Sequence, residues 1–132
     1  MVLGTGHRLL AADRVELREL EGEPWVRFDR DSALDSVLLN VLRDDETTPT
    51  TAARVSQTAT AVRWAAHGLG VTLVTASAVL HGYEHLVRPV FPVVSQPVIA
   101  VLRHDAGPAG TALLELLRQE TWSESASFSP VS

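Results

Sequence analysis

The sequence has no cysteine, few charged residues and no long apolar run, and each absence narrows the class of protein. Without cysteine, neither a disulfide framework nor a thiolate metal site can form. Charged residues make up only 20% of the chain and leave a net charge of −5, so we expect no direct binding to DNA. No apolar run approaches the roughly 20 residues of a membrane span, and the start of the chain lacks the pattern of a signal peptide. A cytoplasmic protein without membrane contact is expected.

What the sequence does contain favours a globular domain. Hydrophobic residues make up 45% of its 132 residues, which is enough for one domain with a core. The end of the chain, SESASFSPVS, is rich in serine and poor in large apolar side chains. We therefore predict a folded domain over residues 1–122 and a disordered Ser-rich tail over residues 123–132.

The stretch VSQTATAVRWAAHGLGVTLVTAS, from Val55 to Ser77, organises the predicted fold. A polar turn leads into a helix whose apolar residues recur at helical spacing, and glycines follow to end that helix. A polar side chain, Gln57 or Thr58, is expected to cap its start. The run over residues 71–74 is short, β-rich and apolar, as in a buried strand. Together they predict a βαβ unit with the helix N-terminus at the carboxyl edge of the sheet, where open α/β sheets bind ligands.

A second junction of the same kind precedes this stretch. Residues 25–28 alternate as a strand does, Asp31 or Ser32 can cap a helix, and residues 34–42 carry a helical apolar stripe. Two helix N-termini, near Ser32 and Thr58, are therefore expected at one edge of the sheet. Hydroxyl and amide groups there can hold a carboxylate or a polar ligand, or they can simply cap the helices. The alternation predicts an α/β fold, an open sheet with helices on both faces.

The remaining pattern predicts further elements on both sides of these junctions. A short turn of helix is expected over residues 15–20, and strands over residues 51–55, 86–90 and 98–102. A last helix is predicted to start at Gly107-Pro108. Its buried side is expected to consist of four leucines: Leu113, Leu114, Leu116 and Leu117.

One short motif suggests chemistry, and its surroundings argue against it. His81-x-x-Glu84-His85 matches the H-x-x-E-H pattern of inverted zinc peptidases. Gly82 and the short apolar flanks are incompatible with the long helix that such a site needs, and no third ligand is evident. Neither a nucleophile elbow nor a phosphate-binding glycine loop occurs. We therefore expect no enzyme, no metal and no cofactor.

Three stretches resemble the effector-binding domain of LysR-type transcriptional regulators. They are SQTATAV…AAHGLGVTLVTAS within residues 56–77, GHRLLAADRVELRELEGEPWVRFDRDS over Gly6–Ser32, and QPVIAVLRHDAGPAGTALLELLRQ over Gln96–Gln119. Their order and spacing along the chain carry the resemblance. It implies a periplasmic-binding-protein-like (type 2) subdomain that senses a small-molecule effector, with an open, mostly parallel sheet and helices on both faces.

In that family the effector lies in a cleft between two subdomains, and the polar turn is one of the linings of the cleft. The resemblance therefore implies a small polar or anionic effector. It places six residues at the effector-binding site: Ser56, Gln57, Thr58, Thr60, Arg30 and Ser32. Trp64 and Tyr83 are expected to be packing residues.

The resemblance covers only part of such a regulator. The DNA-binding winged helix-turn-helix and the first half of subdomain one have no counterpart in the sequence, which leaves subdomain two with the strand and helix that return to subdomain one. The surface that the absent subdomain normally covers favours a homodimer through the strand over residues 98–102 and the last helix. Two alternatives are a truncated fragment that acts only as a dimerisation or interaction module, and a fragment of a solute-binding protein.

Overall fold

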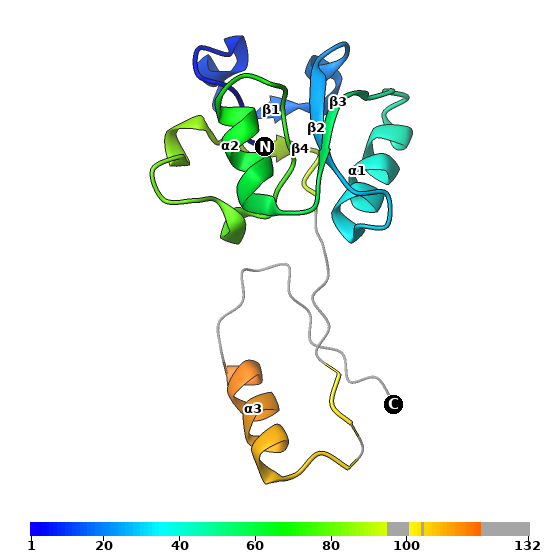
Figure 1. Ribbon diagram of the computed structural model, residues 1–132, viewed down its shortest axis with the longest axis vertical. Coiled ribbons are helices and arrows are strands. Elements are labelled where there is room, and N and C mark those ends of the chain that lie inside the picture. The colour runs from blue at the N-terminus through cyan, green and yellow to red at the C-terminus, as the bar shows by residue number, and fades with distance from the viewer. Residues whose placement is uncertain (95–100, 104, 120–132) are drawn as a thin grey trace. The chain divides into compact units, whose positions relative to one another are not determined.

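The computed structural model describes residues 1–94, 101–103 and 105–119, which belong to two compact units divided after Val94. Figure 1 shows the strands β1 to β4 and the helices α1 and α2 of the first unit, and the helix α3 of the second. The predicted tail over residues 123–132 and positions 98–100 of the predicted strand lie outside the described residues. The described end of that strand, Val101 and Leu102, has no regular secondary structure.

Two parallel strands, β2 (Pro24–Phe28) and β3 (Thr50–Val55), form the centre of the first unit. Their pairing contains one irregularity after Trp25 and ends with Phe28 opposite Val55. Both strands were predicted from the sequence, and both are confirmed. Because the strands are parallel and end together, the chain leaves both of them at the same edge.

A third segment pairs with the opposite edge of β2. Val71 N–H donates to Pro24 O (2.8 Å), and the carbonyl of Val71 accepts from Val26 N–H (2.9 Å). The predicted strand over residues 71–74 is thus limited to bridges at Val71 and Thr72. Since β3, α2 and this segment follow one another along the chain, the predicted βαβ unit is present, with β2 between its two strands.

The second parallel pair joins β1 (Val15–Glu16) to β4 (Val90–Phe91). The prediction of a continuous strand over residues 86–90 is wrong, because Glu84–Leu86 forms a 3₁₀ turn and only a single bridge, from Val87 to Val2, precedes β4. Prolines flank β4 on both sides and cannot donate to a strand ladder, which keeps it short. The predicted turn of helix near the start of the chain is confirmed as a 3₁₀ turn over Leu17–Leu20.

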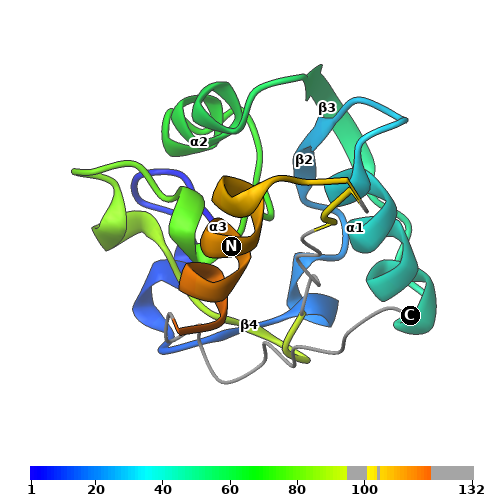
Figure 2. The ribbon, with the colours of Figure 1, turned by 90° about the horizontal axis from the view of Figure 1, so that it is seen from below.

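Helices α1 (Ala33–Asp44) and α2 (Thr58–Ala66) lie on opposite sides of β2 and β3, as Figures 1 and 2 show. The alternation of side chains along β2 explains this arrangement. Trp25 belongs to the buried cluster that includes Leu38 and Leu42 of α1, whereas Val26 and Phe28 belong to the cluster that includes the buried residues of α2. The predicted α/β fold, with parallel strands and helices on both faces, is confirmed.

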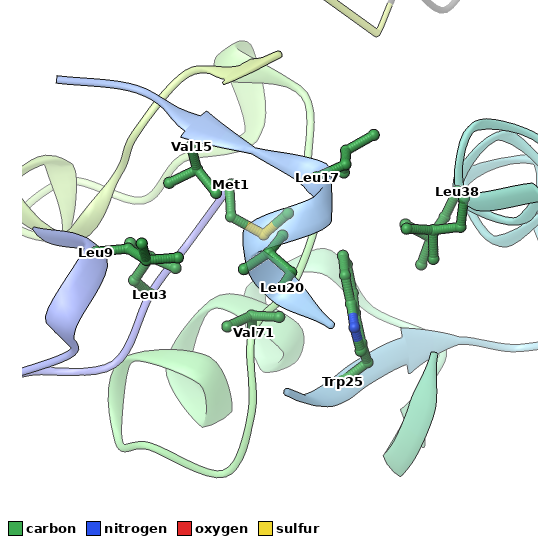
Figure 3. Close-up of a cluster of buried hydrophobic side chains, with 10 residues drawn as sticks. Met1, Leu3, Leu9, Val15, Leu17, Leu20, Trp25, Leu38 and Val71 are labelled. Atoms are coloured by element: carbon green, nitrogen blue, oxygen red, sulfur yellow. The ribbon is translucent and has the colours of Figure 1, made fainter. Parts of the chain in front are cut away.

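Trp25 occupies the centre of the cluster on the α1 side. Its side chain is 0% exposed, and Figure 3 shows it rising from β2 between Leu20 and the α1 residue Leu38. Leu42, one turn after Leu38, is also 0% exposed. The helical apolar stripe that the sequence predicted over residues 34–42 therefore forms the buried side of α1.

A glycine ends α2, as the sequence predicts. Gly68 has a φ of +84°, and its N–H donates to Ala65 O (2.9 Å). The N–H of Leu69 donates to Trp64 O (3.1 Å). This pair of bonds is a Schellman motif, whose left-handed position favours glycine. Gly70 then brings the chain against β2, where a Cβ would lie only 2.6 Å from Pro24 O. These two glycines allow Val71 to pair with β2.

A buried ion network joins α1 to both central strands. Arg27 of β2 donates two hydrogen bonds to Asp35 in the first turn of α1, from Nε (2.9 Å) and from Nη2 (2.7 Å). Arg54 of β3 lies opposite Arg27 in the ladder, and its Nη1 is 3.3 Å from the same carboxylate. Arg27 is 7% exposed and Asp35 is 2% exposed. Charged groups that are this deeply buried have little contact with water, so they depend on one another for stabilisation.

The second unit contains α3 (Pro108–Gln119). The helix starts where the sequence predicted, but the prediction that its leucines form a buried side is wrong. No residue of α3 is buried, and Leu113 and Leu116 are 57% and 61% exposed. The described part of this unit is a single helix and a short segment, too little to cover an apolar stripe. None of the described helices has the length and apolarity needed to cross a membrane.

Replacing Asp35 by alanine tests the ion network. Arg27 would keep its buried charge without a carboxylate partner, and breaking a buried ion pair from one side lowers the free energy of unfolding by about 3–5 kcal/mol. Asp44→Ala, at the exposed last residue of α1, is the matched control and should change stability by less than about 0.5 kcal/mol. Urea denaturation followed by circular dichroism measures both variants. Equal stabilities would show that the network contributes nothing.

Candidate functional site

β2 and β3 end side by side, and each strand continues into a helix. Phe28 lies opposite Val55, and Asp29 N–H extends the pairing by donating to Val55 O (3.1 Å). After short connections, α1 begins at Ala33 and α2 at Thr58. The predicted arrangement, two helix N-termini at the carboxyl edge of parallel strands, is therefore present. In open α/β sheets this edge is where ligands bind.

At the start of α1, serine side chains already form hydrogen bonds with backbone groups of the first turn. Ser32 is the N-cap: its Oγ accepts from Leu34 N–H (3.3 Å), and its carbonyl accepts from Ser36 Oγ (3.3 Å). The predicted cap at Ser32 is confirmed. Arg30 is exposed, and its side chain has no hydrogen bond or ion pair within the part of the chain that the structure describes.

The start of α2 is different. Gln57 is the N-cap by its backbone conformation, but its side chain makes no capping hydrogen bond. The prediction that Gln57 or Thr58 caps this helix through its side chain is wrong, and glutamine is not among the short side chains that favour the position. The side chains of Ser56, Thr58 and Thr60 likewise have no hydrogen-bond partner among residues 1–94, 101–103 and 105–119. Ser56 and Gln57 are exposed, and the two threonines are half-buried.

This difference decides what the edge can bind. Unpaired N–H groups at the start of a helix carry partial positive charge, and with hydroxyl and amide donors beside them they suit a carboxylate or a polar oxygen. At α1 the acceptor oxygen of Ser32 already serves the helix. At α2 four neutral polar side chains remain available: Ser56, Gln57, Thr58 and Thr60. The open part of the candidate site is therefore the start of α2.

Arg54, the residue before the last in β3, was not predicted as a site residue. Its Nη1 donates to Phe28 O (2.6 Å), so the guanidinium lies at the carboxyl end of β2. Its side chain is 28% exposed. The sequence held one signal for it. Arg54 comes two residues before the polar turn, which starts at Ser56, and strand alternation places it on the face opposite to the apolar Val55.

Other parts of the described chain do not form a competing site. Two surface pockets, one beside β1 and one before α3, are not lined by residues of this edge. The His81-x-x-Glu84-His85 motif includes a 3₁₀ turn, and its His81 Nδ1 is 3.2 Å from Glu84 Oε1. Over the described ranges, no group of three or more His, Asp or Glu side chains is arranged to hold a metal ion.

A family model for the LysR substrate-binding domain matches residues 1–122. The chain belongs to the LysR substrate-binding domain family. This LysR substrate-binding domain is similar in structure to the effector-binding domain of QuiR in complex with shikimate, with a TM-score of 0.66 and 16% sequence identity. The match covers 86% of this chain and 56% of the QuiR chain, so the chain spans about half the length of that structure. No curated protein matches the chain.

The family match confirms the resemblance on which the predicted function was based. The predicted function, small-molecule effector sensing in a LysR-type regulator, is the function of this domain family. The predicted fold class is confirmed as well, by the likeness to the QuiR effector-binding domain. Among the elements that the structure describes there is no winged helix-turn-helix.

Two serine substitutions distinguish the closed helix start from the open one. Ser32→Ala removes the side chain that caps α1 and should lower the free energy of unfolding by about 1 kcal/mol. Ser56→Ala removes a hydroxyl that has no partner in the described residues, and should leave stability within about 0.5 kcal/mol of the parent. Urea titrations of the two LysR substrate-binding domain variants provide the comparison. A loss of stability in Ser56→Ala would contradict the open start of α2.

Proposed function

We propose that this LysR substrate-binding domain binds a small polar or anionic effector at the carboxyl edge of β2 and β3. The uncapped start of α2 supports this proposal most directly, because it offers backbone N–H groups together with polar side chains that the described residues leave unpaired. Donors without acceptors are unfavourable unless water or a ligand satisfies them. A ligand with several oxygen atoms would satisfy more of them at once than single water molecules do.

The bound molecule of the QuiR effector-binding domain supports the proposed ligand class. That molecule is shikimate, a small hydroxylated carboxylate. Carboxylate and hydroxyl oxygens both suit the donors at the start of α2. The likeness to QuiR concerns the fold, so shikimate serves as a first probe. The effector would be bound by the six predicted residues: Ser56, Gln57, Thr58, Thr60, Arg30 and Ser32.

Removing two hydroxyl groups from the start of α2 tests the proposed site. The double variant Thr58→Ala/Thr60→Ala should bind more weakly by about 1 kcal/mol for each neutral hydrogen bond lost, or about fivefold in Kd for each. Thr48→Ala, in an exposed loop without a side-chain partner among the described residues, is the control and should bind as the parent does. Isothermal titration starts with shikimate and continues with other small hydroxylated acids. Unchanged affinity in the double variant would remove this turn from the site.

Within a regulator the domain would sense a ligand, without catalysing a reaction. Its family is one of regulatory effector-binding domains. The net charge of −5 disfavours contact with the phosphate backbone, so DNA recognition would belong to another domain. We place the protein in the cytoplasm, where a transcription regulator of this family would meet both effector and DNA. Salt-sensitive binding of duplex DNA by the purified chain would contradict this assignment.

The exposed leucines of α3 support a second role, in self-association. Leu113 and Leu116 are 57% and 61% exposed, and contiguous apolar surface of this kind is typical of interfaces. A second copy of the chain can cover it, since a two-fold contact between identical surfaces closes on itself. The chain would then form a homodimer through α3. A fragment that acts only as a dimerisation module is the alternative function that this observation favours.

Charged substitutions on α3 test the proposed homodimer. The parent chain should scatter light as a dimer at micromolar concentration, and Leu113→Asp/Leu116→Asp should be a monomer, because each buried leucine contributes about 1.5–3 kcal/mol. Thr111→Asp/Gln119→Asp adds the same charge at exposed polar positions of α3 and should remain a dimer. A parent chain that is monomeric over the whole concentration range would contradict the proposal.

A further inference from the structure

We propose that Arg54 binds the acidic group of the effector, and hence that the effector of this domain is a small carboxylic acid. This inference rests on the proposed effector site at the carboxyl edge of β2 and β3, and it names the side chain that selects charge there. The bonds that Arg54 makes, the charge balance around it and its place at the edge each support the assignment.

Arg54 uses fewer of its donors than its neighbour does. Arg27 binds Asp35 through Nε and Nη2, and its Nη1 donates to Thr51 Oγ1 (3.2 Å), so every nitrogen of that guanidinium has a partner. Arg54 uses Nη1 alone, for Phe28 O (2.6 Å) and for Asp35 Oδ2 (3.3 Å). Its Nε and Nη2 have no acceptor among the residues that the structure describes. Two nitrogens of a planar fork are thus left for a ligand, and a fork of this kind matches a carboxylate.

The charges of the ion network do not balance. Arg27 and Arg54 share the single carboxylate of Asp35, and no other acidic group among the described residues lies within 4.0 Å of either guanidinium. An arginine side chain brings one positive charge to such a network. One positive charge in the partly buried network is therefore without a counter-charge. A bound anion would supply it.

Other charges at this edge do not cancel that excess. Asp29, Arg30 and Asp31 follow β2, but all three are exposed to solvent. Exposed charges interact weakly with their surroundings because water and salt screen them. The side chain of Arg54 is only 28% exposed, so a ligand bound to it would meet a less screened charge.

The position of Arg54 is fixed at the edge where the ligand is expected. Its bond to Phe28 O holds the guanidinium at the last residue of β2, and the side chain retains access to solvent. The polar turn Ser56–Thr60 starts at the end of the neighbouring strand. Because adjacent strands lie about 4.8 Å apart, one small molecule can extend from the end of β2 to the start of α2. Arg54 would bind its carboxylate, and the turn would bind its hydroxyl groups.

Nuclear magnetic resonance titration with acetate and with acetamide, its neutral counterpart, tests the assignment. In the full chain, acetate should saturably shift the Nε–H signal of Arg54 and should bind at least about tenfold more tightly than acetamide, as expected for a charge-assisted bond. Arg54→Gln should lose this preference. Arg63→Gln, an exposed arginine on α2, removes the same charge elsewhere and should keep the preference.

Each outcome of the titration decides the assignment. If the parent shows no preference for acetate, or if Arg54→Gln keeps the preference, Arg54 is not the anion-binding residue. A merely structural Arg54 would weaken both probes equally and leave their ratio unchanged. Should Arg54→Gln fail to fold, the Nε–H signal of Arg54 in the parent decides, since it must respond to acetate and not to acetamide. In all these cases shifts of the Ser56–Thr60 amides test the proposed site independently.

Discussion

β2 has a pairing partner at each of its edges and is covered on both of its faces, and this constraint arranges the elements around it. β3 pairs with one edge, and Val71 bridges the other edge, where it satisfies the backbone groups of Pro24 and Val26. Side chains that alternate between faces require an apolar helix surface on each side, which α1 and α2 provide. Both helices start where β2 and β3 end, so the candidate site is built at the ends of two paired and covered strands.

The elements that the sequence predicted correctly depend on local pattern. β2, β3, α1 and α2 follow from alternation, helical spacing and the glycine after α2, all of which lie within a few residues of the element concerned. The errors concern elements that depend on distant partners. Residues 71–74 and 86–90 are apolar enough for strands, yet the length of their pairing is set by distant partners. The first stretch pairs with β2 and Val2, and the second with Val2 and β1. The exposure of α3 depends on what surface is present to cover it, which helical spacing does not report.

The candidate site could be predicted in position but not in its details. Polar residues at a strand-to-helix junction indicate the edge, because parallel strands bring their carboxyl ends together. Whether a given side chain caps its helix depends on its conformation, so the difference between the bonded Ser32 and the unbonded Gln57 could not be read from residue type. Arg54 reaches Phe28 O only through the pairing of two strands that are far apart in sequence.

The unbonded start of α2 has a consequence for how the domain would report its ligand. A helix whose first turn lacks a cap opens there at low free energy, while its far end is held by the Schellman motif at Gly68. An effector bound at the open end would act as the missing cap and would complete the helix. Occupancy would then be transmitted as an increase in order along α2, visible as slower amide hydrogen exchange, without any displacement of the strands.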